Sequence, residues 1–271
     1  MSQQFNEKVA VVTGSSAGLG EAIALLFASR GAKVTFCGLQ PDEGRLQAVL
    51  DKAVKASGGQ KDRFLAVPGD LNDASVRKTI IEETVSKFGR LDILVANAGI
   101  VGDYNPFLKE TEDNYDNILN TNLKSVFFLI QTAVPHLEKT RGSIVSISSL
   151  AAHMVSPDAT TYSLSKVAID HLTRCLAVDL GSKGIRANSV SPGYFPTLIL
   201  RHLGDAETIE REMQKTVKDQ IPLKDRVGVV EDVPEAVAFL ASDAAGFITG
   251  ESVRVDGGRS FIGPIAYSPK K

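Results

Sequence analysis

The stretch Val9-Ala10-Val11-Val12-Thr13-Gly14-Ser15-Ser16-Ala17-Gly18-Leu19-Gly20 decides the fold of this chain. Its first five residues predict a buried strand, and its last residues lead into an apolar helical stretch. The G-x-x-x-G-x-G spacing permits a tight turn whose backbone can approach a pyrophosphate, while the helix N-terminus supplies amide donors. Glycines also serve ordinary turns, but a position between the first strand and the first helix favours a dinucleotide-binding turn. The predicted cofactor contacts are Gly14, Ser15, Ser16, Gly18, Leu19 and Gly20.

The rest of the chain repeats this alternation of short apolar runs and longer amphipathic stretches. Most of the runs lack polar/apolar alternation, which is typical of parallel strands covered by helices on both faces. We therefore predict an α/β, Rossmann-type doubly wound sheet of about seven parallel strands with helices on both faces. The expected strands are 9–13, 33–37, 64–68, 93–96, 143–148, 187–191 and 252–255. The expected helices are 18–30, 42–57, 73–88, 111–138, 162–181 and 232–242.

No linker, repeat or low-complexity tract divides the sequence. We expect a single dinucleotide-binding and catalytic domain over residues 1–271. An irregular stretch from about 194 to 229, with a helix near 206–220, is expected to form a substrate lid. The tail 257–271 is rich in Gly, Pro, Ser and Lys, and we expect it to pack on a neighbour or to fray.

Composition excludes several classes of protein. An apolar content of 43% suits a large core, and a net charge of −2 without charged blocks indicates neither nucleic acid nor an anionic membrane as a partner. The sequence has no apolar run of membrane-spanning length and no recognisable leader, so a cytoplasmic protein is expected. We expect Cys37 and Cys175 to be buried, reduced thiols, and we expect no metal in the site.

Two further strand ends carry candidate cofactor contacts. Asp70 can accept a hydrogen bond from an adenine amino group, with Leu71 packed beside the ring. Taken alone, however, Asp70 is better explained as an N-cap, since residues 72–75 open a helix. At Asn97-Ala98-Gly99 the small residues would let a ribose approach the sheet, although a simple strand-to-loop turn explains them as well.

The candidate catalytic group is Tyr162 with Lys166. Residues at i and i+4 share a helix face, and a nearby cation lowers a phenol pKa that is ordinarily about 10. Tyr-x-x-x-Lys is common on exposed helices, but Ser149 follows a strand at the carboxyl edge, where it can hold a substrate oxygen. Asn122 is either a solvated or capped polar residue, or it marks a kink whose freed carbonyl holds a water linked to Lys166.

In their order and spacing these motifs resemble the short-chain dehydrogenase/reductase family, in its single-domain branch, over residues 6–258. The matching residues are Thr13, Gly14, Gly18, Gly20, Asp70, Leu71, Asn97, Ala98, Gly99, Asn122, Ser149, Tyr162, Lys166, Pro192 and Gly193. One departure is Ala96, where the family carries a first Asn before Asn97-Ala98-Gly99. The C-terminal half looks most like 3-oxoacyl reductase and alcohol dehydrogenase members.

The resemblance implies an NAD(P)(H)-dependent oxidoreductase that interconverts a carbonyl and a secondary alcohol. It implies a catalytic tetrad of Asn122, Ser149, Tyr162 and Lys166, with Lys166 also binding the nicotinamide ribose. Pro192, Gly193 and Thr197 would flank the nicotinamide. Family members also pair the long helices here at 111–138 and 162–181, which implies a homotetramer.

Cofactor choice depends on the end of the second strand. An acid in place of Gly38 would favour NAD by binding the ribose hydroxyls, and a basic residue in place of Leu39 or Ala17 would favour NADP. The chain has neither. The missing acid favours NADP over NAD, and the small Gly38 leaves room for a phosphate beside Ser15 or Ser16, with Leu39 at the edge of the site.

The expected substrate is a small, mostly apolar ketone, secondary alcohol or acyl thioester. Its predicted contacts are Ser149, Ala151, Met154, Tyr162, Tyr194, Phe195 and Leu198, although part of this set can simply pack the lid on the body. A direct catalytic role for His153 is not expected. The alternative function is a nicotinamide-binding sensor or scaffold without turnover. A protein of that kind would be expected to lack one residue of the catalytic tetrad, whereas this chain has all four.

Overall fold

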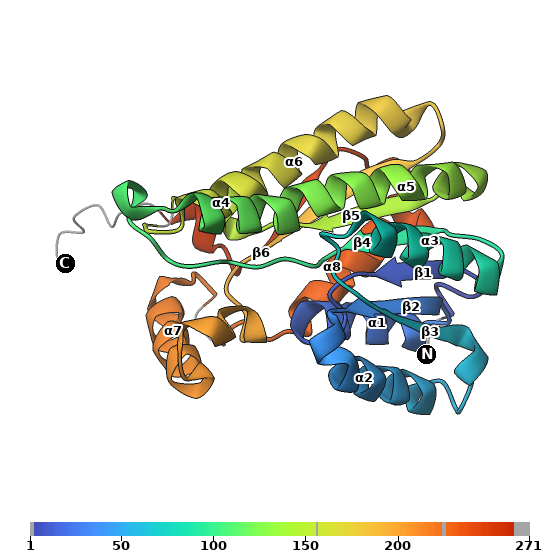
Figure 1. Cartoon of the computed structure of the whole chain (residues 1–271), viewed down its shortest axis with the longest axis horizontal. Helices are drawn as coiled ribbons and strands as arrows, with labels where there is room; N and C mark the ends of the chain where they lie inside the picture. The colour runs from blue at the N-terminus through green and yellow to red at the C-terminus, as the bar shows by residue number, and fades with distance from the viewer. Residues whose placement is uncertain (1–2, 156, 224–225, 263–271) are drawn as a thin grey trace.

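A computed structural model of the chain describes residues 3–155, 157–223 and 226–262. Its centre is a seven-stranded parallel sheet with the order β3-β2-β1-β4-β5-β6-β7 (Figure 1). The strands are β1 Val9–Val12, β2 Lys33–Gly38, β3 Phe64–Pro68, β4 Ile93–Ala96, β5 Ser143–Ile147, β6 Arg186–Pro192 and β7 Ser252–Val255. The predicted doubly wound sheet is thus confirmed. Strand order reverses between β1 and β4, and ligands of such sheets bind at this reversal.

Helices cover both faces of the sheet (Figure 1). They are α1 Gly18–Ser29, α2 Glu43–Ala56, α3 Ala74–Phe88, α4 Glu112–Leu119, α5 Ser125–Thr140, α6 Thr160–Gly181, α7 Ala206–Gln220 and α8 Asp232–Ala241. Helices α1, α2 and α8 lie together on one face, and α3, α5 and α6 lie on the other. Within the described ranges, no helix is both long and apolar enough to cross a membrane.

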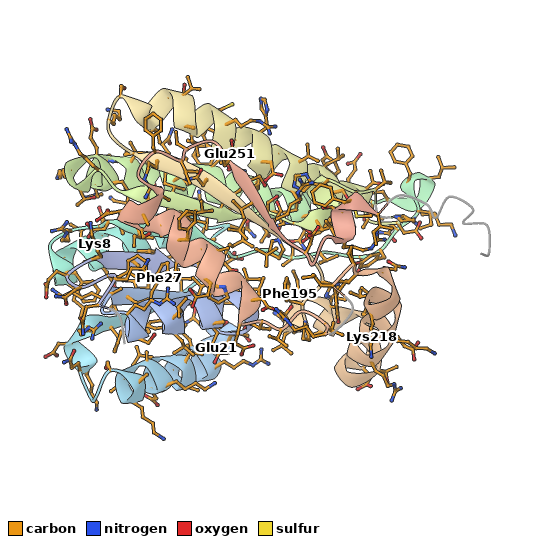
Figure 2. The ribbon with its side chains drawn as sticks, turned by 180° about the vertical axis from the view of Figure 1, so that it is seen from behind. Lys8, Glu21, Phe27, Phe195, Lys218 and Glu251 are labelled. Carbon is orange, nitrogen blue, oxygen red and sulfur yellow. The ribbon has the colours of Figure 1, made fainter. Side chains whose placement is uncertain are left out.

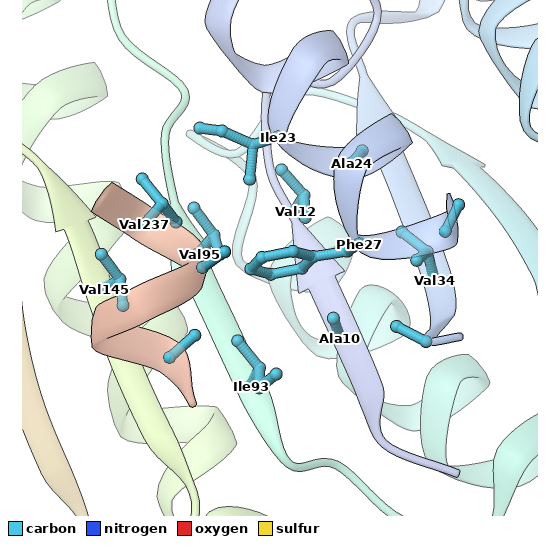
Figure 3. Packing of buried hydrophobic residues seen from close by; sticks show 14 of the residues in the cluster. Ala10, Val12, Ile23, Ala24, Phe27, Val34, Ile93, Val95, Val145 and Val237 are labelled. Atoms are coloured by element: carbon cyan, nitrogen blue, oxygen red, sulfur yellow. The ribbon is translucent and has the colours of Figure 1, made fainter. Parts of the chain in front are cut away.

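The sheet is rigid because apolar side chains are buried on both of its faces. On the α1 side, Phe27 packs among side chains from β1, β2 and β4, and Val237 of α8 closes the cluster (Figure 3). Val12 points into this cluster, whereas its neighbour Val11 points into a second cluster under α3 and α5. Burial of each large apolar side chain stabilises the folded state by about 1.5–3 kcal/mol. The carboxyl ends of the strands are therefore held in fixed positions.

The segment predicted as one helix over 111–138 is not a regular α-helix. Helices α4 and α5 are joined by a π-helical segment, η4 Asn120–Lys124, which contains Asn122. A π turn inserts extra backbone into the helix and locally changes the direction of side chains. The prediction of one continuous helix is therefore wrong. Of the two alternatives for Asn122, the structure favours an irregular helix over a solvated residue, because Asn122 is buried in the π segment.

The expected lid contains two elements. A 3-10 segment, η6 Leu198–Leu203, precedes α7, which stands away from the sheet (Figure 1). The Asp205 carboxylate caps α7 by accepting a hydrogen bond from the Thr208 amide at 2.9 Å. Of the expected tail, residues 263–271 lie outside the described residues.

The two cysteines differ in environment. Cys37 on β2 is buried, as expected, and burial raises the pKa of its thiol. Cys175 is exposed on α6, so the prediction that it is buried is wrong. A helix of 22 residues presents an outer face as well as an inner one, and an apolar neighbourhood in sequence does not say which face a residue occupies.

Candidate active site

A cavity of about 1150 Å³ runs along the carboxyl edge of the sheet, from the glycine-rich turn to the lid. Two of the predicted site residues, Ser15 and Asn122, are not part of its wall. The wall includes the other predicted residues, which are Gly14, Ser16, Gly18, Leu19, Gly20, Leu39, Asp70, Leu71, Asn97, Ala98, Gly99, Ser149, Ala151, Met154, Tyr162, Lys166, Pro192, Gly193, Tyr194, Phe195, Thr197 and Leu198. The fold thus brings together groups that are up to 184 residues apart, from Gly14 to Leu198.

The glycine-rich turn needs its glycines for sterics. Gly14 and Gly18 have φ values of +63° and +60°, in the left-handed region. A Cβ on Gly20 would lie 2.2 Å from the Gly14 carbonyl oxygen and 2.4 Å from Asn97 Nδ2. Ala17, the N-cap of α1, makes no side-chain cap, so the first amides of the helix have no side-chain acceptor there. A phosphate fits this arrangement of bare backbone and helix N-terminus.

The strand end at Asn97 is fastened to this turn. Thr13 Oγ1 accepts hydrogen bonds from the amides of Asn97 at 3.0 Å and Ala98 at 3.1 Å. In return, Asn97 Nδ2 donates to the Thr13 carbonyl at 2.8 Å. These hydrogen bonds between Thr13 and the segment at Asn97 fix the spacing between the ends of β1 and β4. Ala98 and Gly99, which follow Asn97, line the cavity.

Ser15 and Ser16 have different surroundings. Ser15 is fully buried, and its Oγ accepts from the Cys37 amide at 2.9 Å, so its prediction as a phosphate contact is wrong. This hydroxyl instead ties the turn to β2. Ser16 lies at the cavity, and a Cβ on Gly38 would approach its Oγ to 3.0 Å. The small residue at position 38 is thus required by the neighbouring turn.

Asp70 is not the N-cap of α3. That cap is Asp73, whose Oδ1 accepts from the Ser75 amide at 2.7 Å. Asp70 accepts from the Asn72 amide at 2.9 Å and is exposed at the cavity wall. The capping interpretation of Asp70 is therefore wrong, and its carboxylate lies at the cavity wall.

Tyr162 lies near the start of α6, facing Ser149 at the carboxyl end of β5. Burial raises the pKa of the Tyr162 phenol to about 12, a hydrogen bond with Ser149 lowers it, and Tyr104 raises it. Ser149 Oγ also accepts from the Ala151 amide at 3.1 Å, which fixes the hydroxyl at the start of its loop. An added positive charge is needed before Tyr162 can exchange its proton near neutral pH.

Lys166 supplies a positive charge one turn further along α6. Its side chain is buried, and Nζ donates to the Ile147 carbonyl at 3.0 Å. Nζ lies 5.7 Å from the centre of the Tyr162 ring. Burial lowers the pKa of Lys166 to about 8, and Asp170 opposes this change. The hydrogen bond to the Ile147 carbonyl, at the end of β5, thus holds the Lys166 ammonium near the Tyr162 ring.

Asn122 lies behind the cavity wall. Its Oδ1 accepts from the Ile100 amide at 2.8 Å, and its Nδ2 donates to the Ile100 carbonyl at 2.8 Å and to Ser165 Oγ at 3.1 Å. A Cβ on Gly99 would lie 3.1 Å from Asn122 Oδ1 and 3.4 Å from Lys166 Nζ. The π segment therefore brings Asn122 against the loop that runs past Lys166. A water on its carbonyl stays a prediction.

Sequence reasoning missed three charged residues at the end of the cavity beside β2 and α2. Arg45 of α2 and Arg201 of η6 line the wall together with Asp42. Arg45 Nη1 lies 3.0 Å from Asp42 Oδ1, and Arg201 Nη2 lies 4.0 Å from Asp42 Oδ2. The available signal was the basic residue in the first turn of the helix after β2. Arg201 comes from the lid and offered no such signal.

A parallel sheet with a glycine-rich turn at its reversal point, and with Tyr162 and Lys166 in the wall of the same cavity, is the arrangement of a nicotinamide-dependent oxidoreductase. The chain belongs to the short-chain dehydrogenase/reductase family. Residues 14–260 match the family profile described as enoyl-(acyl carrier protein) reductase. The residues expected from the family resemblance line the cavity just described, apart from Thr13 and Asn122.

Relatives and solved structures agree with this assignment. The chain is 38% identical to an uncharacterized oxidoreductase of Thermotoga maritima, covering 95% of this chain and 99% of the relative. It is 39% identical to the Staphylococcus aureus 3-oxoacyl-acyl-carrier-protein reductase FabG, covering 93% and 97%.

Among structures, a Caenorhabditis elegans short-chain dehydrogenase/reductase with cofactor matches with a TM-score of 0.88 at 32% identity, covering 96% of this chain and 97% of that one. The C. elegans glucose dehydrogenase matches with a TM-score of 0.81 at 38% identity, covering 96% of this chain and 100% of that one.

Proposed function

We propose that the protein interconverts a carbonyl and a secondary alcohol on a small, mostly apolar molecule, with Tyr162 as general acid and base. The observation that carries this proposal is the meeting of Tyr162, Ser149 and Lys166 at one wall of the cavity. A phenol that is buried there and bonded to a serine hydroxyl is poised to share a proton with a third oxygen, that of the substrate.

In this mechanism the nicotinamide cofactor supplies or accepts the hydride. The Ser149 hydroxyl and the Tyr162 phenol bind the substrate oxygen, and Tyr162 donates its proton to that oxygen during reduction. Lys166, anchored on the Ile147 carbonyl at 3.0 Å, stabilises the phenolate that remains. In oxidation the same phenolate takes the proton back. Asn122 supports the reaction by fixing the loop at Ile100.

The cavity residues fit a dinucleotide. Gly14, Gly18 and the amides that begin α1 would hold the pyrophosphate. Asp70 and Leu71 would contact the adenine, and Lys166 would reach the nicotinamide ribose. A Cβ on Gly18 would lie 3.2 Å from Thr197, so the lid begins directly against the glycine-rich turn. Pro192, Gly193 and Thr197 would then border the nicotinamide.

We propose NADP(H) as the preferred cofactor. No acid occupies position 38, and the guanidinium groups of Arg45 and Arg201 both lie near Asp42 in the cavity wall. A 2′-phosphate would bind these guanidinium groups in place of part of the Asp42 contact.

Calorimetry with two ligand fragments tests this choice. Adenosine 2′,5′-bisphosphate is expected to bind at least about tenfold more tightly than 5′-AMP, and Arg45→Ala should remove most of that difference. Lys55→Ala, an exposed change on the same helix, is the matched control and should retain it. Equal affinities for the two fragments in the wild type would refute the NADP proposal.

The substrate end of the cavity is mostly apolar. Ala151, Met154, Tyr194 and Leu198 line it, and apolar lining favours a hydrophobic ketone or alcohol over a sugar. Phe195 lines it too, but this side chain is only 7% exposed and packs into the core on the α1 side, between the body and α7 (Figure 2). Its main role is therefore to seat the lid.

We further propose a homotetramer. Several apolar side chains on α5 and α6 are exposed, an arrangement that pairing between subunits would bury. They are Phe127, Phe128, Leu164, Val167 and Val178. Phe247, before β7, and Phe261, after it, are exposed as well and offer a second contact. Light scattering at micromolar concentration should give about four times the mass of one chain, and a monomeric mass would refute the proposal.

Turnover is the experiment that separates this function from the sensor alternative. Wild-type protein with NADPH or NADH is mixed with apolar ketones and a 3-oxoacyl thioester, and the reduced nicotinamide absorbance is followed. Loss of absorbance that depends on the ketone is expected. Tight cofactor binding without turnover on any carbonyl would favour the sensor.

A further inference from the structure

A buried carboxylate, Asp170, lies behind the catalytic wall with no role in the mechanism above. It belongs to α6 and is only 6% exposed. Ser189 Oγ of β6 donates to its Oδ1 at 2.9 Å, and Ser252 Oγ of β7 donates to the same oxygen at 3.2 Å. His153 Nε2 lies 3.4 Å from its Oδ2.

The hydrogen bonds around Asp170 run in one direction. Because the single Ser252 proton goes to Asp170, Ser191 Oγ must donate to Ser252 Oγ across their 2.9 Å contact. Ser191 must then accept from His153 Nε2, which lies 3.2 Å away. Each donor therefore points toward the carboxylate, and this arrangement stabilises a negative charge at Asp170.

Hydrogen bonding alone does not require a charge at this position. A neutral amide oxygen can accept from Ser189 and Ser252 equally well, and burying a carboxylate costs free energy. A buried charge is ordinarily paired with a charge of the opposite sign. Lys166 lies four residues earlier on the same helix, so the two side chains share one face.

Few charged groups act on the Lys166 ammonium. Asp170 of α6 is the charge that raises its pKa against the effect of burial. From the other elements packed around it, Asn122 of η4, the Ile147 carbonyl of β5 and the backbone at Gly99 are all neutral. Two further titratable groups lie nearby, but neither contacts Lys166 directly. Tyr104 interacts with Tyr162, and His153 contacts Asp170.

We propose that Asp170 is a positioning residue of the active site, and that its serine-held carboxylate keeps the Lys166 ammonium charged beneath Tyr162. This inference rests on the proposed function, since it assigns Asp170 a part in setting the proton affinity of the Tyr162–Lys166 pair. The contacts of Asp170 also join α6 to β6, to β7 and to the loop after Ser149. The same carboxylate therefore helps to fix the helix that carries Tyr162 and Lys166 and the loop that follows Ser149.

The test measures Lys166 itself and needs no substrate. The protein is prepared with isotope-labelled lysine, and the Nζ resonance that disappears in Lys166→Met is followed by NMR against pH. In the wild type it should titrate near a pKa of about 8. In Asp170→Asn, which keeps the acceptor and removes the charge, the midpoint should fall by about one to two pH units.

Two controls separate charge from packing. Ser252→Ala removes one hydrogen bond to Asp170 and leaves the carboxylate, so the Lys166 midpoint should stay close to that of the wild type. Asp179→Asn removes the same charge from the exposed side of α6 and should have little effect. If Asp170→Asn does not fold, Asp170→Ser provides a second neutral variant with the same expected fall.

The outcomes distinguish this inference from the proposed function. An unchanged Lys166 midpoint in the neutral variants would overturn the role of Asp170, even if Tyr162 proves essential for turnover. A shifted midpoint supports that role, even in a protein that reduces no ketone in the panel. The acid limb of alcohol oxidation should move to higher pH in Asp170→Asn, because a neutral lysine no longer favours the phenolate.

Discussion

Replacement of Asn122 by alanine offers a quantitative test of how the π segment supports the site. The change removes three hydrogen bonds, two to the backbone of Ile100 and one to Ser165 Oγ. Each such bond contributes about 1 kcal/mol, and the Ile100 amide and carbonyl lose their side-chain partner in a partly buried place. The free energy of unfolding should therefore fall by about 2–4 kcal/mol. For a chain of this size, that corresponds to a loss of about 5–10 °C in Tm.

The same change should impair catalysis. With Ile100 released, the backbone at Gly99 no longer has a fixed place beside Lys166 Nζ, so kcat should fall by about tenfold or more. Denaturant unfolding and steady-state kinetics measure the two effects. Gln131→Ala, an exposed amide on α5, is the matched control and should alter stability by less than about 0.5 kcal/mol. Wild-type stability and kcat in Asn122→Ala would refute the reasoning.

Three further predictions concern other parts of the structure. Gly20→Ala places a Cβ 2.2 Å from the Gly14 carbonyl, so cofactor affinity measured by fluorescence titration should fall by about tenfold or more; unchanged affinity would count against the turn. Burial raises the pKa of Glu110, but hydrogen bonds led by that from Asn114 bring it to about 2, below the ordinary value. Glu110→Gln should thus lose stability relative to the wild type above pH ~4.5, with the difference vanishing as pH falls toward ~2; a pH-independent difference in urea unfolding would contradict this. A maleimide should label Cys37 only after unfolding, since this thiol is buried, and rapid labelling in the native state would show that β2 opens.

Much of the fold followed from local sequence. The strands at 64–68, 93–96 and 252–255 were predicted with their observed bounds. The first two are apolar runs, and the third is a short segment that ends at the turn Asp256-Gly257-Gly258. The interruption of helix 111–138 was considered only as one of two alternatives for Asn122, a kink or a solvated polar residue. A π turn depends on tertiary partners, here Ile100 and Ser165, that helix propensity does not contain.

The site was predicted unevenly for similar reasons. Tyr162, Ser149 and Lys166 sit at fixed offsets from strand and helix ends, so their meeting followed from topology. Ser15 could not be told from Ser16 by sequence, since only the path of β2 determines which hydroxyl is taken by Cys37. Arg201 lies 4.0 Å from Asp42 only through the tertiary fold, because the two residues are far apart in the sequence. The cytoplasmic location expected from composition stays a prediction.

In the proposed mechanism, Tyr162 transfers the proton that accompanies hydride transfer. The most direct measurement is the single-turnover rate of nicotinamide oxidation with a saturating ketone, for the wild type and Tyr162→Phe, together with cofactor affinity for both. We predict that Tyr162→Phe binds the cofactor within about threefold of the wild type and that its hydride-transfer rate falls by about 10²–10⁴. Equal rates in the two proteins, with equal cofactor binding, would contradict the claim.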